Sequence, residues 1–420
     1  MNRIVLIGNG FDLAHGLKTS YRDFINWYWE QRLQENDLKS GYTTQDDLCT
    51  VRFSPGMSYD DIIQFSKKHQ DLLDNKTPWQ KIMILQRNGL LVLEMKPFFT
   101  NIMYSVESKN WVDIEIEYYK ILKSEVSGSL TYLESISSLN EQLEFLQRKL
   151  VEYLLTIEID ERMLNPFIRE IIYEPIDIKD ISIEGRTEFV SHVDYWFRAS
   201  DEQWKDRFVQ YAIPKKTRDF IPQCREMYEK MTFEMQKRMI FSEELLHTHK
   251  YPDQIYLLSF NYTSTAQQYW DDYDGFGYNY IHGKLKEDSN PIIFGYGDEL
   301  DDKYMQIVNQ NDNTLLSHFK SIRYLETDNY KKILTFIDSA PFQIYIMGHS
   351  CGNSDRTLLN TLFEHKNCVS IKPFYHIDSS GKDNYMEIVQ NIARNFTDMK
   401  LMRDRVVNKT YTKAFSDDRN

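Results

Sequence analysis

The first residues of the chain carry a continuous apolar run that predicts a buried strand. Residues 3–7 (Arg-Ile-Val-Leu-Ile) are rich in β-branched side chains, and the turn-forming Gly8 and Gly10 follow at once. A helix is expected next, over 21–33. A strand, a glycine turn and a helix open the doubly wound nucleotide-binding folds. The complete G-x-G-x-x-G fingerprint is missing, because Leu13 occupies the position of its last glycine.

Strand-like runs return in the last part of the chain. They share a short length, apolar or β-branched residues, and in most cases a polar or glycine residue directly after the run: 254–260, 278–281, 291–294, 342–347 and 369–371. A helix is expected over 355–365. Ligands of open α/β sheets bind at the carboxyl ends of the strands, so we expect the residues after these runs to meet in one crevice.

The middle of the chain has a helical pattern instead. One apolar helix face is formed at spacings of 3, 4, 4 and 3 by Leu143, Leu146, Leu150, Leu154 and Ile157. We interpret this face as core packing. Segments near 40–60 and 180–190 are expected to be loops. The sequence therefore predicts an α/β protein in which 1–35 and 251–420 form a Rossmann-like parallel-sheet domain. Residues 36–250 would form a large, mainly helical insertion that serves as a sensor, an oligomerisation element or a lid.

Composition narrows the class of protein. The 420 residues include 50 Lys+Arg and 63 Asp+Glu, a net charge of −13, which argues against a nucleic-acid binder that lacks a local basic groove. The four cysteines form no C-x-x-C pair, so we expect neither a zinc knuckle nor a disulfide framework. No signal peptide or membrane-spanning run is evident, so we expect a cytoplasmic protein with no membrane partner.

The first turn carries candidate ligand-binding residues. The glycines of Gly8-Asn9-Gly10 would let backbone N–H groups approach a phosphate. Asn9 and Asp12 add polar groups that suit a ribose or an amide. The alternative is an ordinary turn between strand and helix, with Asp12 as a helix cap.

Two later strand ends carry candidate catalytic residues. Asn261 follows the run 254–260 and offers both a donor and an acceptor for a sugar hydroxyl or a water molecule. The alternative is an Asx turn that ends the strand. His282 follows 278–281 and is a candidate general base near neutral pH. The alternative is a structural histidine held by one hydrogen bond.

The segment 348–352 (Gly-His-Ser-Cys-Gly) matches the G-x-S-x-G nucleophile elbow of α/β-hydrolases. That fold needs an acid and then a histidine after the serine. The acids that follow Ser350 are Asp355 and Glu364, both expected on the next helix. Neither is expected to reach a histidine from a separate strand end. We therefore do not favour a serine hydrolase.

Taken together, these motifs resemble the AbiH family, which is associated with bacterial abortive infection against phage. The blocks that carry the resemblance are L-I-G-N-G-F-D-L-A-H-G-L at 6–17, T-S-Y-R-D-F at 19–24, W-V-D-I-E at 111–115, S-F-N-Y-T at 259–263, I-H-G at 281–283 and M-G-H-S-C-G-N-S-D at 347–355. Their order agrees with the family from end to end.

The same layout resembles the NAD-binding core of sirtuin-like defence proteins, which implies NAD as substrate or ligand. In that arrangement Asn261 would position the nicotinamide ribose or a water, and His282 would act as the base. The dinucleotide would be held by Gly8, Asn9, Gly10 and Asp12, and its adenosine end by the last block, with Gly348, His349, Ser350 and Asp355. The zinc-binding cysteine pairs of sirtuins are missing here, so we do not expect protein deacylation or a metal site.

The predicted function is that of a phage-defence effector that binds NAD(P) or a related nucleotide and hydrolyses its N-glycosidic bond. The cleavage passes through an oxocarbenium-like state, which needs an oriented ribose, a positioned water and groups that stabilise positive charge. One alternative is a non-catalytic nucleotide-binding sensor or interaction module. Another is a nuclease-type toxin, which would usually want clustered carboxylates for a metal. We expect a homo-oligomer or a defence-system partner protein, and a phage trigger that the sequence does not identify.

Overall fold

The computed structural model describes two compact units. The described residues are 1–34, 39–41, 43–109, 113–126, 128, 135–157, 164–242, 245–270 and 276–417, so Trp111 and Val112 of the W-V-D-I-E block lie outside them. The first unit is made of Met1–Gly16, Ile159–Ile293 and Tyr324–Asn420, and the second of Leu17–Glu158 and Phe294–Arg323.

This division does not follow the boundaries expected from the sequence. Residues 164–242 were expected in a separate insertion but belong to the sheet-containing unit, whereas 17–34 belong to the second unit. The physical reason is burial. Three of the helices within 186–240 share one apolar cluster with Met1, which precedes the first strand, and with Val369, which lies in a later strand of the sheet.

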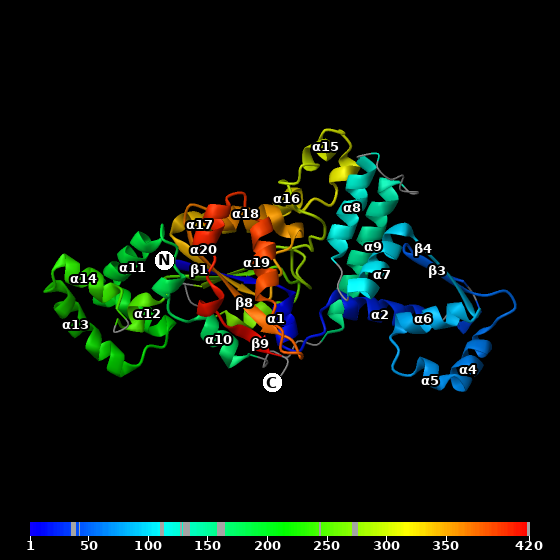
Figure 1. The fold of residues 1–420 in the computed structure, drawn as a ribbon, viewed down its shortest axis with the longest axis horizontal. Coiled ribbons are helices and arrows are strands. Elements are labelled where there is room, and N and C mark those ends of the chain that lie inside the picture. Colours follow the sequence, from blue (N-terminus) through cyan, green and yellow to red (C-terminus); the bar gives the residue numbers. More distant parts are fainter. Residues whose placement is uncertain are drawn as a thin grey trace. The chain divides into compact units, whose positions relative to one another are not determined.

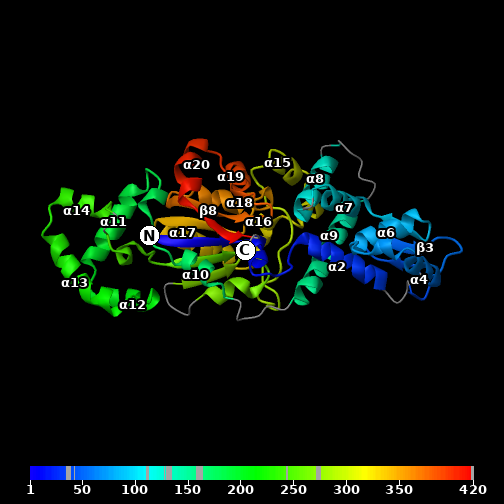
Figure 2. The same cartoon turned by 60° about the horizontal axis from the view of Figure 1, so that its bottom comes forward.

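The first unit is built on a six-stranded parallel sheet to which both ends of the chain contribute strands (Figures 1 and 2). Its strands are β1 (Asn2–Ile7), β5 (Ile255–Ser259), β6 (Phe276–Tyr280), β7 (Phe342–Met347), β8 (Cys368–Ile377) and β9 (Ala414–Asp417). The expected parallel α/β sheet is therefore confirmed, together with five of the six strands predicted for it.

The order of the strands across the sheet is β6-β5-β1-β7-β8-β9. Numbered by their sequence within the sheet, this order is 3-2-1-4-5-6. The chain first builds outward from β1 through β5 to β6, and then returns to the other side of β1 to add β7, β8 and β9. The direction of winding thus reverses between β1 and β7, which is where open α/β sheets form a crevice.

The central strand β1 is buried on both faces. It pairs along its length with β5 on one side and β7 on the other, so that Val5 lies between Leu257 and Tyr345. Ile4 and Leu6 belong to one apolar cluster, and Val5 belongs to the cluster on the opposite face. Alternate residues of a strand point to opposite faces, and because both faces are covered, all of residues 4–7 are apolar.

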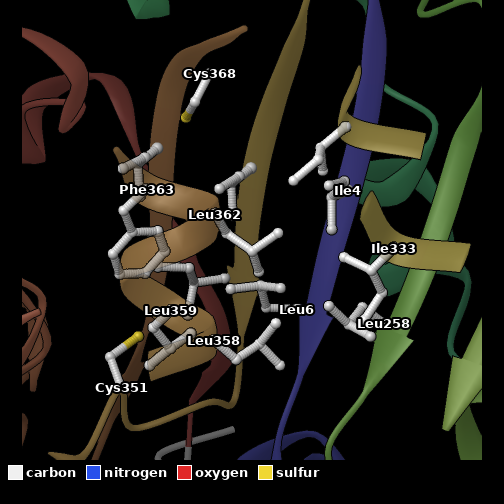
Figure 3. Close-up of a cluster of buried hydrophobic side chains, with 14 of the residues drawn as sticks. Ile4, Leu6, Leu258, Ile333, Cys351, Leu358, Leu359, Leu362, Phe363 and Cys368 are labelled. Atoms are coloured by element: carbon white, nitrogen blue, oxygen red, sulfur yellow. The ribbon is translucent and has the colours of Figure 1, made fainter. Parts of the chain in front are cut away.

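One face of the sheet is covered by helices from the end of the chain. They are α17 (Asn329–Ser339), α18 (Arg356–Phe363), α19 (Tyr385–Arg394) and α20 (Met399–Arg405). Figure 3 shows Leu358, Leu359 and Leu362 of α18 gathered with Leu6 of β1 in this cluster. Each of these leucines is fully buried, which stabilises the unit by about 1.5–3 kcal/mol per side chain. The helix predicted over 355–365 is confirmed as α18.

The other face is covered by α1 (Asn9–Ala14) and α10 (Pro166–Ile172). The side chain of Asn165 accepts hydrogen bonds from the first N–H groups of α10, and Pro166 occupies its first turn. Helix α1 begins inside the Gly8-Asn9-Gly10 turn, where no helix was predicted. The unit is completed by α11 (Arg186–Arg198), α12 (Asp201–Gln210), α13 (Lys215–Glu229) and α14 (Phe233–Ile240).

The second unit combines helices with a small antiparallel sheet. Its helices are α2 (Tyr21–Gln34), α4 (Tyr59–Lys68), α5 (Gln70–Leu73), α6 (Pro78–Arg87), α7 (Pro97–Lys109), α8 (Ile114–Val126), α9 (Ile136–Leu155), α15 (Tyr304–Val308) and α16 (Lys320–Arg323). Its sheet has the order β2-β3-β4, formed by Thr44–Gln45, Cys49–Phe53 and Leu91–Met95. The leucine face predicted over 143–157 is confirmed on α9 for its four leucines, whereas Ile157 lies past the helix end.

Three sequence expectations are corrected by the structure. The segment 40–60 is not only a loop, because it contains β2, β3 and the start of α4. The segment 180–190 contains the start of α11. The run 291–294 is not a strand: its buried Ile293 and Phe294 pack in the interior from an irregular backbone. No helix among the described residues combines the length and apolar character needed to span a membrane.

Candidate functional site

The residues that follow β1, β5, β6 and β7 lie at the carboxyl edge of the sheet, within the first unit. These are neighbouring strands, on both sides of the point where the winding reverses. The candidate residues of the sequence fall into two groups here. One joins the loops after β1 and β5, and the other joins those after β6 and β7.

The first group is centred on the Asp12 carboxyl. The hydroxyl of Thr263 donates to its Oδ2 at 2.6 Å, and the hydroxyl of Thr265 donates to Thr263 at 3.3 Å. The side chain of Asn261 donates from Nδ2 to the carbonyl oxygen of Gly8 at 3.0 Å. Both candidate side chains therefore tie the turn after β1 to the loop after β5.

Burial strongly perturbs this carboxyl. Asp12 is only 1% exposed, and its Oδ1 has no hydrogen-bond partner among the described residues. Burial raises the pKa of Asp12 to about 6, although the hydrogen bond from Thr263 opposes the shift. Perturbed carboxyls of this kind gather at functional sites, because a fold gains no stability from them. The structure does not use Asp12 as the side-chain cap of α1, since the residue lies within the helix.

The glycines of the first turn serve the packing of two loops. The N–H of Gly8 donates to Met347 at 3.3 Å, and the N–H of Gly10 donates to Gly348 at 2.9 Å. A Cβ on Gly8 would lie 2.5 Å from the Cα of His349. The backbone hydrogens expected to approach a phosphate at Gly8 and Gly10 are thus engaged by the loop after β7. The glycines are explained by this contact without any ligand.

The second group is an aspartate between two histidines. Asp355 Oδ1 lies 3.3 Å from His282 Nε2, and its Oδ2 lies 3.5 Å from His349 Nε2. The Tyr324 hydroxyl lies 3.2 Å from the same His282 nitrogen. The two histidines and the aspartate are 4%, 6% and 8% exposed, so their interactions are only weakly screened by water. Asp355 therefore does reach a histidine from a separate strand end, contrary to the expectation from the sequence.

Aromatic packing holds the two imidazole rings. The Phe260 ring centroid lies 4.1 Å from that of His349 and 5.2 Å from that of His282. The Tyr324 ring lies nearly parallel to that of His282, at 6°. Phe260 leads out of β5 and donates its N–H to the Ile7 carbonyl at 2.9 Å. The rings are thus held by the residue that follows β5 and by the short 3-10 helix Tyr324–Glu326.

The geometry of the G-x-S-x-G block differs from that of a nucleophile elbow. In an elbow the serine itself occupies the strained turn position. Here the positive φ angles of the block are at Gly348 (75°) and Cys351 (55°). Ser350 is exposed, and its carbonyl accepts a hydrogen bond from Asn391. The block shapes the loop that carries His349 and Asp355.

Comparison with known proteins gives one family. The model of bacteriophage abortive infection AbiH matches residues 4–376, which is most of the chain and includes every candidate site residue. The chain belongs to the AbiH family. A search of curated proteins found no match.

The sequence motifs of this AbiH chain contained most of the site, but some contributors were not identified. Thr263 lies in the same block as Asn261, and its place at a strand end was the available signal. Phe260 precedes Asn261 and was not identified because it was predicted as part of the strand 254–260. Tyr324 lies outside every motif, so nothing in the sequence pointed to it. The described residues contain no group of three His, Cys, Asp or Glu side chains arranged to hold a metal ion.

Proposed function

We propose that this AbiH protein is a phage-defence effector whose first unit binds NAD(P) or a related nucleotide and hydrolyses its N-glycosidic bond. The AbiH family itself supports a role in phage abortive infection. We propose nucleotide binding and hydrolysis in addition to this role. We also keep the proposal that helices within 36–250 sense infection or hold an oligomer together.

The strand order supports nucleotide binding. The order 3-2-1-4-5-6 is that of Rossmann-type sheets, which bind dinucleotides across the crevice where the winding reverses. The candidate residues lie at the carboxyl ends of β1 and β7, which flank this point, and of β5 and β6 beside them. The N–H groups of Gly8 and Gly10 already donate to the Met347 and Gly348 carbonyls. We therefore expect the Asp12 side chain to recognise the ligand at the first turn.

The chemistry of Asn261 and His282 suits cleavage of a glycosidic bond. Because Asn261 Nδ2 donates to Gly8, its amide oxygen is the acceptor that can orient a ribose hydroxyl or a water. The Nε2 atom of His282 lies 3.3 Å from the Asp355 carboxylate, and a histidine oriented by a carboxylate is a common general base for the activation of a water. Asn261 would orient the water or the ribose, and His282 would take a proton from the water. Attack by water on the glycosidic carbon requires both.

One observation carries the proposal. Two buried polar groups, Asp12 with Thr263 and His282 with Asp355, lie at the carboxyl ends of the four neighbouring strands β6, β5, β1 and β7, which span the reversal point. Buried polar groups are costly to the fold, and their concentration at a ligand-binding edge indicates a functional site.

The test is incubation of the purified protein with NAD or NADP, with and without phage lysate, and chromatography of released nicotinamide. We expect His282→Ala and Asn261→Ala to abolish the release. The matched control is His365→Ala, which removes a half-buried histidine elsewhere in the first unit. This variant should keep the activity.

The same experiment separates the alternatives. NAD that binds but is not cleaved would favour a non-catalytic nucleotide sensor. Degradation of nucleic acid that depends on a divalent metal would favour a nuclease-type toxin. Neither binding nor cleavage of NAD(P) under any condition would refute the proposal.

A further inference from the structure

The side chain of Asp355 does not cap the helix that follows it. It stands at the N-cap of α18, where an aspartate side chain usually accepts hydrogen bonds from the first N–H groups of the helix. Here the side chain makes no capping hydrogen bond. Both carboxylate oxygens instead face imidazole nitrogens, at 3.3 Å from His282 and 3.5 Å from His349. The helix therefore lacks a side-chain cap that would ordinarily stabilise it.

The hydrogen bonds of His349 fix its tautomer. The backbone N–H of Cys351 points at His349 Nδ1 at 3.0 Å. A backbone N–H can only donate, so Nδ1 must carry the lone pair. The hydrogen of the neutral ring is therefore on Nε2, the atom that faces Asp355 Oδ2. His349 acts as a fixed donor that holds one oxygen of the carboxylate.

The other oxygen then determines the state of His282. A carboxylate oxygen only accepts, so His282 Nε2 must carry a hydrogen to interact favourably with Asp355 Oδ1. The lone pair of the neutral ring is left on Nδ1. The Tyr324 hydroxyl, at 3.2 Å from Nε2, lies on the same side of the ring as Asp355.

We propose that Asp355, held by His349, is a positioning residue that keeps the hydrogen of His282 on Nε2 and makes Nδ1 the basic atom of the site. The inference replaces the adenosine contact expected for Asp355 and His349, and it rests on the proposed function for the reaction that His282 serves. In that reaction the attacking water gives one proton to His282 Nδ1 while its oxygen forms the new bond to the ribose carbon. The bond to nicotinamide breaks, and its electron pair leaves with the neutral base. The Asp355 carboxylate stabilises the imidazolium that results.

The replacement Asp355→Asn makes a sharp prediction. An asparagine has one acceptor oxygen and one NH2 group where the aspartate has two acceptors. The fixed Nε2–H of His349 takes the oxygen, so the NH2 group faces His282. Its Nε2 must then accept, which moves the hydrogen of His282 to Nδ1 and removes the base. A positioning aspartate of this kind is worth about 100-fold to 10,000-fold in kcat.

The test reads the tautomer directly. Histidine is labelled with 15N, and two-bond proton–nitrogen spectra distinguish hydrogen on Nδ1 from hydrogen on Nε2. His282→Gln identifies the signal by its loss. We expect the wild type to carry hydrogen on Nε2, Asp355→Asn to carry it on Nδ1, and Tyr324→Phe to keep it on Nε2. For nicotinamide release, Asp355→Asn should lower kcat at least about 100-fold with KM changed only a few-fold.

A matched control exists in the same unit. Asp338 Oδ1 lies 3.4 Å from His365 Nε2, so Asp338→Asn makes the same chemical change in a second aspartate–histidine pair. It should leave the His282 signal and turnover unchanged. Hydrogen on Nδ1 of wild-type His282, or an unchanged tautomer in a folded Asp355→Asn variant, would overturn the inference. If Asp355→Asn does not fold, the spectra of the wild type and of Tyr324→Phe decide. If the wild type releases no nicotinamide, the proposed function fails, but the tautomer still decides this inference.

Discussion

Replacement of Asp12 by asparagine should make the stability of the protein less sensitive to pH. Burial raises the pKa of Asp12 from 3.8 to about 6 in the folded state. The folded protein therefore binds a proton more tightly than the unfolded chain. Above the folded pKa the buried charge is fully present, and it costs the fold about 3 kcal/mol, because one pKa unit corresponds to about 1.4 kcal/mol. This cost disappears as the pH falls toward 4. The free energy of unfolding of the wild type therefore decreases as the pH rises from about 4 through the folded pKa of about 6.

The assay compares the free energies of unfolding of the wild type and Asp12→Asn in urea at pH 5 and pH 8. The difference between the two proteins should shift by about 1 to 2 kcal/mol in favour of the variant at pH 8, since about half of the full cost is already present at pH 5. Every other titrating group cancels in this comparison. Asp219→Asn, at an exposed position of the first unit, is the control for the substitution itself. A difference that is the same at both pH values would refute the reasoning about Asp12.

Three further outcomes follow from the same structure. Gly348→Ala should lower the free energy of unfolding by about 2 kcal/mol or more relative to Gly16→Ala in thermal unfolding, because both glycines have φ of 75° but only a Cβ on the former meets backbone, at 2.1 Å. Burial lowers the pKa of His249 to about 3, so the free energy of unfolding of the wild type should fall by about 2 kcal/mol from pH 7 to pH 5, where only the unfolded chain takes up the proton. His249→Phe should remove this fall. Thr263→Val should lower the free energy of unfolding by about 1–3 kcal/mol at pH 8, where the charged Asp12 carboxylate accepts the hydrogen bond of the hydroxyl, and by less at pH 5.

The sheet was predictable because its central strands are buried on both faces. Residues 3–7 and 342–347 are apolar except for Arg3 and Gln343 and are followed directly by glycine, and such runs carry their own signal. The run 291–294 has the same composition without being a strand, because Ile293 and Phe294 are buried from an irregular backbone. Burial and strand formation are separate properties, and the sequence reports mainly the first. The strand β3 was missed because only alternate residues of it are buried.

The location of the site was predictable, whereas its pairings were not. The rule that ligands bind at strand ends placed Asn261, His282 and His349 at one edge from the sequence alone, whereas Asp355 was expected on the following helix and out of reach of a histidine from another strand end. The contact between His282 and Asp355 depends on the path of the loop after β7, which the positive φ angles at Gly348 and Cys351 determine. No local pattern in the sequence encodes that path.

The measurement that most directly tests the central claim is the NAD content of phage-infected bacteria that produce this protein or its His282→Ala variant. We expect NAD to fall after infection only in cells with the intact site, and protection from phage to be lost together with this fall. Protection by the wild type while NAD stays constant, or an equal fall of NAD with the variant, would show that the protein does not act by NAD cleavage at this site.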